Sequence, residues 1–183
     1  MTNVDAKRPQ LGGEHPSYSW TEAPRGLPGK AADPARLAAA MQHPSYPLTS
    51  AYEPGWVLQN SMGPIPLWLL EGLAPLLDLK PGQRVLDLGC GLAITSIFLA
   101  REFGVEVWAA DLWIDAEQNR LRIDEAGLTD RVHPIAADAH RLPFEHGFFD
   151  AVVSIDAYHY FGTEIRYLSY LAQFLRKGGR IGV

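Results

Sequence analysis

The stretch RVLDLGCGLAI, residues 84–94, decides the fold class of this chain. Its first five residues form a short apolar run of the kind that occupies a buried parallel strand. Gly89 and Gly91 follow at once, and a glycine lets the backbone turn tightly and approach a ligand with no Cβ in the way. Residues with helical spacing begin at Ile94. The stretch therefore predicts a strand, a glycine bend and a helix, which together open a βαβ unit.

The same alternation of patterns continues along the chain. Further strands are expected at residues 105–110, 131–137, 148–155 and 180–183. Further helices are expected at residues 66–78, where Pro75 should bend or shorten the helix, at 114–127, and at 164–177, where Gly178-Gly179 should end it. Strands that alternate with helices predict an α/β fold, with a doubly wound, mostly parallel sheet and helices on both faces. The sheet would be cut off in its fifth strand.

The composition of the chain changes near residue 55. Eight of the 14 prolines lie before that point, so residues 1–55 form a Pro/Gly-rich N-terminal arm. One short helix is expected in it, with Asp33 as the N-cap and Pro34 as the first helical residue. The arm is either a partly disordered leader or a lid that folds over a ligand site. Residues 56–183 would form the core domain, incomplete at its C-terminus.

Length and charge exclude several classes of protein. The 183 residues are 47% hydrophobic and carry a net charge of −5, which fits one domain and argues against a nucleic-acid binder. The single cysteine, Cys90, excludes an internal disulfide framework and a Cys-cluster zinc site, and no metal site is expected. No apolar stretch is long enough to span a membrane. Because the N-terminus MTNVDAKRPQ lacks the apolar core of a signal peptide, we expect a cytoplasmic protein.

Acidic residues stand at the ends of three successive predicted strands. Asp87 lies at the end of the first, Asp111 follows the second and Asp138 follows the third. Because the carboxyl ends of parallel strands meet at one edge of the sheet, these carboxylates should lie beside the glycine bend. Each one alone could be a helix cap or a loop residue. The set of three favours a nucleoside site, in which a carboxylate accepts the hydroxyls of a ribose.

The glycine spacing narrows the class of nucleoside. The dinucleotide fingerprint G-x-G-x-x-G needs glycine at position 94, where this chain has Ile94. The loop G-x-x-x-x-G-K-[ST] of nucleoside triphosphate sites is also absent from the sequence. A smaller nucleoside without phosphates fits better.

The motif VLDLGCGLA, residues 85–93, closely resembles the first motif of the class I S-adenosylmethionine-dependent methyltransferases. Residues 142–154 and 175–183 resemble the family's entry into the fourth and fifth strands. The resemblance covers residues 66–183 and is of the bacterial small-molecule type. Ala93 is a departure, because the commonest form of the motif has a third glycine there.

This resemblance implies S-adenosyl-L-methionine as the cofactor. Gly89 and Gly91 would line its methionine end, with Asp87 near the amino group, and Asp111 would take the ribose hydroxyls. Asp138 would meet the adenine amine. The cofactor-binding residues expected on this basis are Asp87, Gly89, Cys90, Gly91, Asp111, Leu112, Asp138, Ala139 and Ser154.

The segment after the fourth strand, SIDAYHYF at residues 154–161, is the place for the reacting groups. Methyl transfer from a sulfonium is an in-line displacement, so positioning matters most, and a base is needed only when the nucleophile must lose a proton. His159 is the candidate base because its ordinary pKa is near 6.5; alternatively it orients a neighbour or binds substrate. Asp156 and Tyr158 complete the catalytic candidates, and Tyr160 is a substrate-binding candidate.

The segment YEPGWVLQNSMG, residues 52–63, precedes the helix that leads into the core. In related enzymes such a segment closes over the cofactor. We therefore expect Tyr52 to contact the cofactor, and Trp56, Asn60 and Met62 to contact the substrate. The alternative is that the segment is a packing strap.

The function predicted from the sequence is transfer of a methyl group from S-adenosylmethionine to a small-molecule acceptor, on O, N or C. The alternatives are another enzyme of the same fold, including a nicotinamide-dependent one, and a non-catalytic or partner-dependent cofactor-binding module. The family's Asn/Asp-Pro-Pro-Tyr signature for nucleic-acid bases is absent from the sequence, so no nucleic-acid partner is expected. A homodimer partner or a missing C-terminal segment should cover the edge of the fifth strand.

Overall fold

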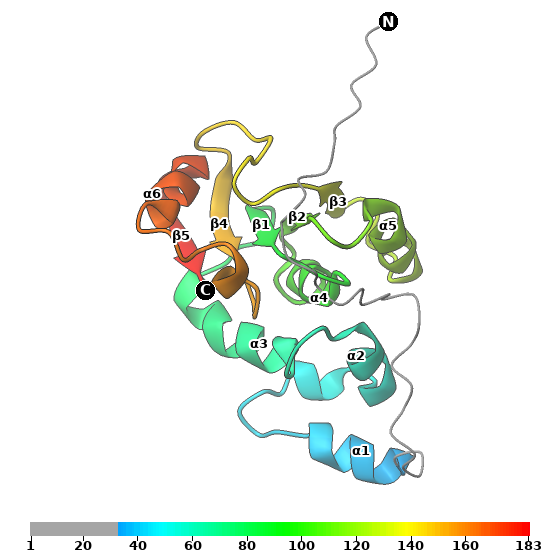
Figure 1. Ribbon diagram of the computed structural model, residues 1–183. Coiled ribbons are helices and arrows are strands. Elements are labelled where there is room, and N and C mark those ends of the chain that lie inside the picture. The colour runs from blue at the N-terminus through cyan, green and yellow to red at the C-terminus, as the bar shows by residue number, and fades with distance from the viewer. Residues whose placement is uncertain (1–32) are drawn as a thin grey trace, which may run out of the picture. The chain divides into compact units, whose positions relative to one another are not determined.

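The computed structural model describes residues 33–183, which form one compact unit (Figure 1). Most of the arm predicted at residues 1–55 therefore lies outside the described residues. Five strands form one sheet in the spatial order β3-β2-β1-β4-β5, and every neighbouring pair is parallel. The strands are β1 (Arg84–Leu88), β2 (Glu106–Asp111), β3 (Val132–Ala136), β4 (Phe149–Val153) and β5 (Leu175–Gly182). The chain moves outward from β1 to β3 and then returns to the other side of β1, which is the predicted doubly wound order.

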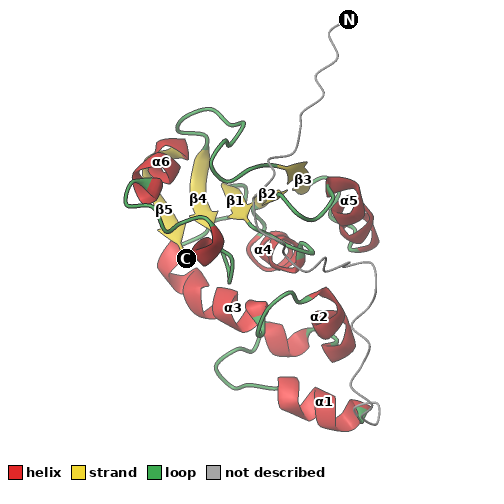
Figure 2. Cartoon of the chain, in the orientation of Figure 1, coloured by secondary structure: helices red, strands yellow, loops and turns green. Residues whose placement is uncertain are grey.

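Helices cover both faces of this sheet. They are α1 (Pro34–Met41), α2 (Pro54–Asn60), α3 (Pro66–Leu77), α4 (Ile94–Phe103), α5 (Ala116–Glu125) and α6 (Tyr167–Leu171). Val85, Val107 and Ala151 pack in one buried cluster with residues of α3, α4 and α5. Leu86 and Val152 face the other way and pack with residues of α6. Figure 2 shows the strands side by side, with α5 at the β3 end of the sheet and α6 at the β5 end.

Acidic caps begin three of these helices. Asp33 caps α1 by accepting a hydrogen bond from the Ala35 amide, as expected, and Pro34 is the first helical residue. Glu53 caps α2 by accepting from the amides of Gly55 and Trp56, and Asp115 caps α5 by accepting from the Glu117 amide. A carboxylate at a helix N-terminus accepts hydrogen bonds from free amides and interacts favourably with the positive end of the helix dipole. The local sequence therefore determines where these three helices begin.

A buried carboxylate holds the chain before α2 against α3. Glu71 of α3 is 9% exposed, and it accepts hydrogen bonds from the amides of Leu48 and Thr49 and from the Thr49 hydroxyl. Residues 48 and 49 lie in the predicted arm, yet this contact joins them to a core helix. The arm and the core are therefore continuous from Asp33 onward.

The last predicted helix, residues 164–177, is wrong in length. The structure has only α6, a 3₁₀ turn at Ala172–Phe174, and then β5 beginning at Leu175 rather than at Arg180. The register of β5 on β4 shifts between the pairs Phe149↔Leu175 and Ala151↔Arg180. Gly178 and Gly179 therefore form a bulge inside a strand and do not end a helix. A Cβ on Gly179 would lie 2.9 Å from the Asp150 carbonyl oxygen, so this bulge needs a glycine.

Candidate functional site

Asp87 occupies the carboxyl end of β1 and is 1% exposed. One of its oxygens, Oδ2, accepts hydrogen bonds from the hydroxyls of Thr95 and Ser96 in the first turn of α4, both at 2.6 Å. The other, Oδ1, is buried without a hydrogen-bond partner. Burial raises the pKa of this carboxyl to about 6, and the nearby Asp111 carboxylate contributes a smaller repulsion. Asp87 is thus a half-satisfied buried acid.

The bend that follows Asp87 has an unusual backbone. Gly89, Gly91 and Ala93 all have positive φ, at 77°, 53° and 59°. The amides of Gly89 and Cys90 both donate to the Ala110 carbonyl of β2. Ala93 is fully buried in a left-handed conformation that glycine adopts without strain, so the alanine noted above adds on the order of 1–2 kcal/mol of strain.

Asp111, at the end of β2, holds the other side of this bend. Its Oδ2 accepts from the Gly91 amide at 2.8 Å, and its Oδ1 accepts from the amides of Trp113 and Ile114. The side chain is 9% exposed. Asp111 therefore fixes the shape of two loops whether or not a ribose is bound, a role that the strand-end pattern did not reveal.

Asp138 lies two residues beyond Ala136, which pairs with Asp111 in the sheet. It accepts from the His140 amide at 2.9 Å and pairs with Arg141, and these groups hold the pKa of its carboxyl below the usual range, the amide contributing most. The structure thus places Asp87 and Asp111 at the carboxyl ends of β1 and β2, and Asp138 just after β3, at one edge of the sheet, as predicted. Asp138 also caps its own turn, the alternative that sequence left open.

Side chains from two other segments pack against the glycines. A Cβ on Gly89 would lie 2.5 Å from the Ala157 Cβ, and one on Gly91 would lie 2.9 Å from the Met62 sulfur. Gly63 lies against the carboxylate of Asp156, whose backbone is left-handed with φ of 55°. The loop before α3 and the loop after β4 therefore meet over the bend. Met62 is the one member of the predicted 52–63 set that reaches it.

The predicted reacting groups lie in a 3₁₀ turn, Tyr158–Tyr160, that follows β4. His159 is exposed and packs against Tyr160, with ring centroids 4.1 Å apart and the rings tilted by 40°. Tyr160 also meets Trp113 of the loop after β2, edge to face at 5.2 Å. Tyr158 packs on Phe161 and Tyr167 instead. The structure thus brings His159 and Tyr160 to the same edge as the β2 loop, and Tyr158 faces the apolar cluster under α6.

The remaining predicted cofactor residues differ in exposure. Leu112 is 63% exposed beside Asp111. Ser154 is buried and donates its hydroxyl hydrogen to the Leu88 carbonyl at 2.8 Å, which joins the ends of β4 and β1. Ala139 is buried, and its carbonyl accepts from the Tyr167 hydroxyl. Cys90 is a buried free thiol whose pKa is raised by burial. Leu112 offers the most accessible apolar surface of these.

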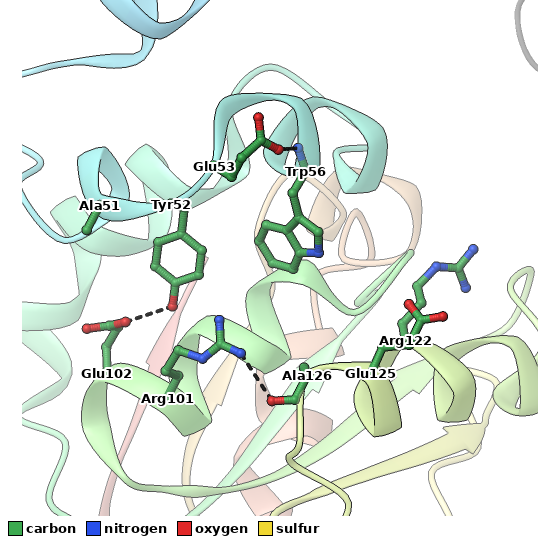
Figure 3. Close-up of a pocket in the computed structure, with 9 residues that line it drawn as sticks. All are labelled: Ala51, Tyr52, Glu53, Trp56, Arg101, Glu102, Arg122, Glu125 and Ala126. Carbon is green, nitrogen blue, oxygen red and sulfur yellow. Dashed lines mark hydrogen bonds between the residues drawn. The ribbon is translucent and has the colours of Figure 1, made fainter.

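Tyr52, Trp56 and Asn60 lie elsewhere. The Tyr52 hydroxyl donates to Glu102 at 2.7 Å, at the end of α4 opposite the bend, and burial raises the pKa of this phenol. Tyr52 and Trp56 line a cavity of about 470 Å³ together with Arg101 and Glu102. Figure 3 shows these four side chains around it. Trp56 and Asn60 line a second cavity of about 440 Å³ against α5. Neither cavity is lined by the bend or the three acids. The contacts expected of these three side chains with the cofactor and the substrate stay predictions.

Three polar residues of the site escaped the sequence analysis. Thr95 and Ser96 hold Asp87, and Asn119 of α5, 1% exposed, donates its side-chain amide hydrogen to the Gly91 carbonyl at 2.9 Å. Asn119 had a visible signal, because it stands four residues before the buried Ile123 and so on the apolar face of its helix.

Two features are absent from residues 33–183. In that part of the chain there is no cluster of three or more His, Cys, Asp or Glu side chains that could hold a metal ion. None of the helices described there is both long and apolar enough to cross a membrane.

Known proteins resemble this chain in sequence and in fold. The family model described as "Methyltransferase domain" matches residues 85–179, more than half of the chain. The methyltransferase GfsG of Streptomyces halstedii is 34% identical over 116 residues, 63% of this chain and 42% of that protein. The 27-O-demethylrifamycin SV methyltransferase of Amycolatopsis mediterranei is 32% identical over 116 residues, 63% of this chain and 43% of that protein.

A solved structure gives the same match in three dimensions. The SAM-dependent methyltransferase from Geobacter sulfurreducens, in complex with S-adenosyl-L-homocysteine, aligns with a TM-score of 0.54 and 32% identity. The alignment covers 62% of this chain and 46% of that one. The chain thus spans less than half the length of these three relatives.

Proposed function

Since the chain belongs to the methyltransferase-domain family, we propose that it binds S-adenosyl-L-methionine and transfers the methyl group to a small-molecule acceptor. Two of the relatives named above are methyltransferases by name, and the third is a SAM-dependent methyltransferase with S-adenosyl-L-homocysteine bound. The proposal applies to the site at the carboxyl edge of the sheet, where parallel α/β folds place their ligands.

The observation that carries this proposal is the unpartnered oxygen of Asp87. A buried carboxylate oxygen without a donor is unfavourable, and a ligand with a positive group would satisfy it. S-adenosylmethionine carries positive charge on its ammonium and sulfonium groups. The carboxylate of Asp111 adds further negative charge beside the bend. The residues present therefore fit a cationic nucleoside better than a phosphate ester.

The predicted acids, the two glycines and Leu112 each have a place in the proposed site. Asp87 would hold the ammonium, and the faces of Gly89 and Gly91 would line the methionine end once Ala157 and Met62 give way. Asp111 has used three of its roughly four acceptor positions on amides, which leaves one for a ribose hydroxyl. Leu112 would cover the adenine, and Asp138 would accept from its amine.

When bound, the sulfonium supplies a methyl group that is already activated for displacement. The protein has to bind the acceptor, exclude water and align it. His159, Tyr160 and Trp113 form an aromatic group in the loops after β4 and β2, suited to holding an apolar or aromatic acceptor. His159 is the side chain there that could serve as the base for an O–H or N–H acceptor. Asp156 can bind an acceptor amine.

A calorimetric titration with S-adenosylmethionine and S-adenosylhomocysteine tests the cofactor. We expect micromolar binding of both by the wild type, and weaker binding by Asp87→Asn, which keeps the shape and removes the charge. The matched control is Asp150→Asn at the opposite end of the sheet, where Asp150 pairs with Arg176. Wild-type protein that binds neither ligand, or an Asp87→Asn protein that binds both as well as wild type, contradicts the proposal.

The alternative of a non-catalytic module has its own outcome in the same experiments. In an enzyme that uses His159 as a base, His159→Ala keeps cofactor binding and loses on the order of 10²–10⁴-fold in turnover. Binding without turnover over a panel of candidate acceptors, with no effect of His159→Ala, favours the module. The cytoplasmic location stays a prediction. So does the expectation that a second copy of the chain, or a further segment, covers the edge of β5.

A further inference from the structure

The peptide of Gly91 is held from both sides by side chains of two different elements. Asp111, at the end of β2, accepts the hydrogen of the Gly91 amide at 2.8 Å. Asn119, on α5, donates to the Gly91 carbonyl oxygen at 2.9 Å. The side chain of Asn119 is almost fully buried, so water does not compete for these positions. The bend therefore depends on α5, an element 28 residues further along the chain.

The orientation of the Asn119 amide is determined by both of its neighbours. Arg122, one turn further along α5, places its Nη1 3.3 Å from Asn119 Oδ1. An arginine can only donate and a backbone carbonyl can only accept. The oxygen of Asn119 must therefore face Arg122, and its NH₂ group must face Gly91. Arg122 thus keeps the Asn119 NH₂ group turned toward the bend, where it donates to the Gly91 carbonyl and also meets the Cys90 sulfur at 3.8 Å.

Holding Gly91 matters because its backbone is left-handed, with φ of 53°, and because it follows the half-satisfied Asp87. Glycine adopts that conformation as readily as others, so the residue itself does not fix the bend. Its two buried hydrogen-bond partners, Asp111 and Asn119, fix the conformation of the bend. Without one of them the peptide can rotate, and the ligand face of the bend changes.

We propose that Asn119 is a positioning residue for the cofactor, which sets the glycine bend for the amino-acid end of S-adenosylmethionine without touching it. The inference rests on the proposed function and adds a residue to it. It predicts a selective defect: loss of Asn119 weakens ligands that have the methionine end and spares ligands that consist of the nucleoside alone.

Two ligands and one substitution test this selectivity. S-adenosylhomocysteine carries the amino-acid end, and 5′-methylthioadenosine has the same nucleoside without it. We expect Asn119→Ala to raise the Kd of S-adenosylhomocysteine by at least about 5-fold, the effect of one hydrogen bond, and to leave the Kd of 5′-methylthioadenosine within about 2-fold. An equal loss for both ligands, as general loosening of the fold would give, overturns the inference, and so does no loss for either.

A second variant keeps the test decisive if Asn119→Ala does not fold. Asn119→Asp has the same shape, and its carboxyl can donate to the Gly91 carbonyl only when protonated. The titratable and charged groups around it are Asp87, Cys90 and Asp111 at the bend and Arg122 on α5. At pH 9, where this carboxyl is ionised, we expect Asn119→Asp to bind S-adenosylhomocysteine more weakly than wild type and to bind 5′-methylthioadenosine within about 2-fold of wild type.

Gln118→Glu is the matched control, because it adds the same charge at an exposed position next to Asn119. It should bind both ligands as wild type does at the same pH. Unchanged S-adenosylhomocysteine affinity in Asn119→Asp, or the same loss in both variants, contradicts the positioning role. Wild-type protein that binds neither ligand overturns the proposed function itself, and wild-type binding with unaffected variants overturns only the role of Asn119.

Discussion

The ionisation of one buried residue, Asp87, should make the stability of the protein depend on pH. Its ionised form is disfavoured in the folded protein, because burial raises its pKa to about 6. The unfolded chain ionises this group near its ordinary pKa, so the folded state binds the extra proton between the two values. The free energy of unfolding should therefore fall as the pH rises through that window and change no further above it.

The expected size of this effect is about 3 kcal/mol, the equivalent of a shift of roughly two pKa units in a fully buried group. Urea unfolding of wild type and Asp87→Asn between pH 4 and pH 8 measures it. The difference in stability between the two proteins isolates Asp87 from other carboxyls, such as Asp138, whose pKa is lowered. A difference that does not vary with pH would show that Asp87 ionises normally.

Asp111 should affect stability as well as binding. Asp111→Ala leaves the amides of Gly91, Trp113 and Ile114 without their acceptor. We expect a loss of about 1–3 kcal/mol in unfolding free energy and a loss of similar size in S-adenosylhomocysteine affinity. Chemical denaturation and calorimetry measure the two.

The control for Asp111 is Asp138→Ala, because Asp138 is half-exposed and its partners are exposed. Exposed ion pairs contribute little, so this variant should unfold within about 1 kcal/mol of wild type. If Asp111→Ala loses ligand affinity but no stability, the three amides have found other acceptors and its structural role is wrong.

Residue types at strand ends were predictable from sequence, and their partners were not. Spacing alone placed Asp87, Asp111 and Asp138 at one edge. Asn119 could not be assigned to Gly91 from sequence, because the contact depends on how closely α5 packs on the bend.

Glu71 shows how an element can depend on one buried group. Its carboxylate satisfies two amides and a hydroxyl of residues 48 and 49, and this contact fastens the chain before α2 to α3. Glu71→Ala should lower the unfolding free energy by about 2–5 kcal/mol, because it leaves buried polar groups without partners. Limited proteolysis should then cut first between residues 42 and 53.

Glu117→Ala is the comparison for this prediction, since Glu117 is an exposed residue that pairs with Arg120. It should change neither the stability nor the cleavage pattern. Cleavage of Glu71→Ala at the same sites and rates as wild type would mean that apolar packing alone holds the segment.

Element boundaries were predictable where the local sequence determines them. Asp33-Pro34 began α1 as expected, and β1 through β4 fell within one or two residues of the predicted ranges. The helix predicted at residues 164–177 was too long at both ends, and Ile165 and Leu168 in its first half are exposed. Leu175 instead pairs with Phe149 of β4, a tertiary contact that overrides the local pattern.

Ligand binding should stabilise the described unit as a whole. Asp87, Asp111 and the glycine bend join β1, β2, α4 and α5, so a ligand that binds them stabilises the folded state only. At 100 times its Kd, S-adenosylhomocysteine should add about 2.7 kcal/mol. For a chain of this length the Tm should rise by on the order of 5–10 °C. Differential scanning calorimetry with and without ligand measures this rise, and adenosine triphosphate at the same concentration should give none.

Pro134, in the edge strand β3, affects how readily two molecules of this protein associate through that edge. The Ala137 amide donates to Asp111 of β2, so in this strand the odd-numbered amides face β2 and the even-numbered ones face outward. Pro134 therefore lacks its hydrogen on the outward side, at the centre of the strand. A strand from another molecule therefore meets no backbone donor at this position, and a continuous hydrogen-bond ladder cannot form along β3. This edge of the sheet should resist edge-to-edge aggregation. Pro134→Val would restore the backbone N–H donor at this position, and the variant should aggregate faster than wild type when both are stored at the same concentration.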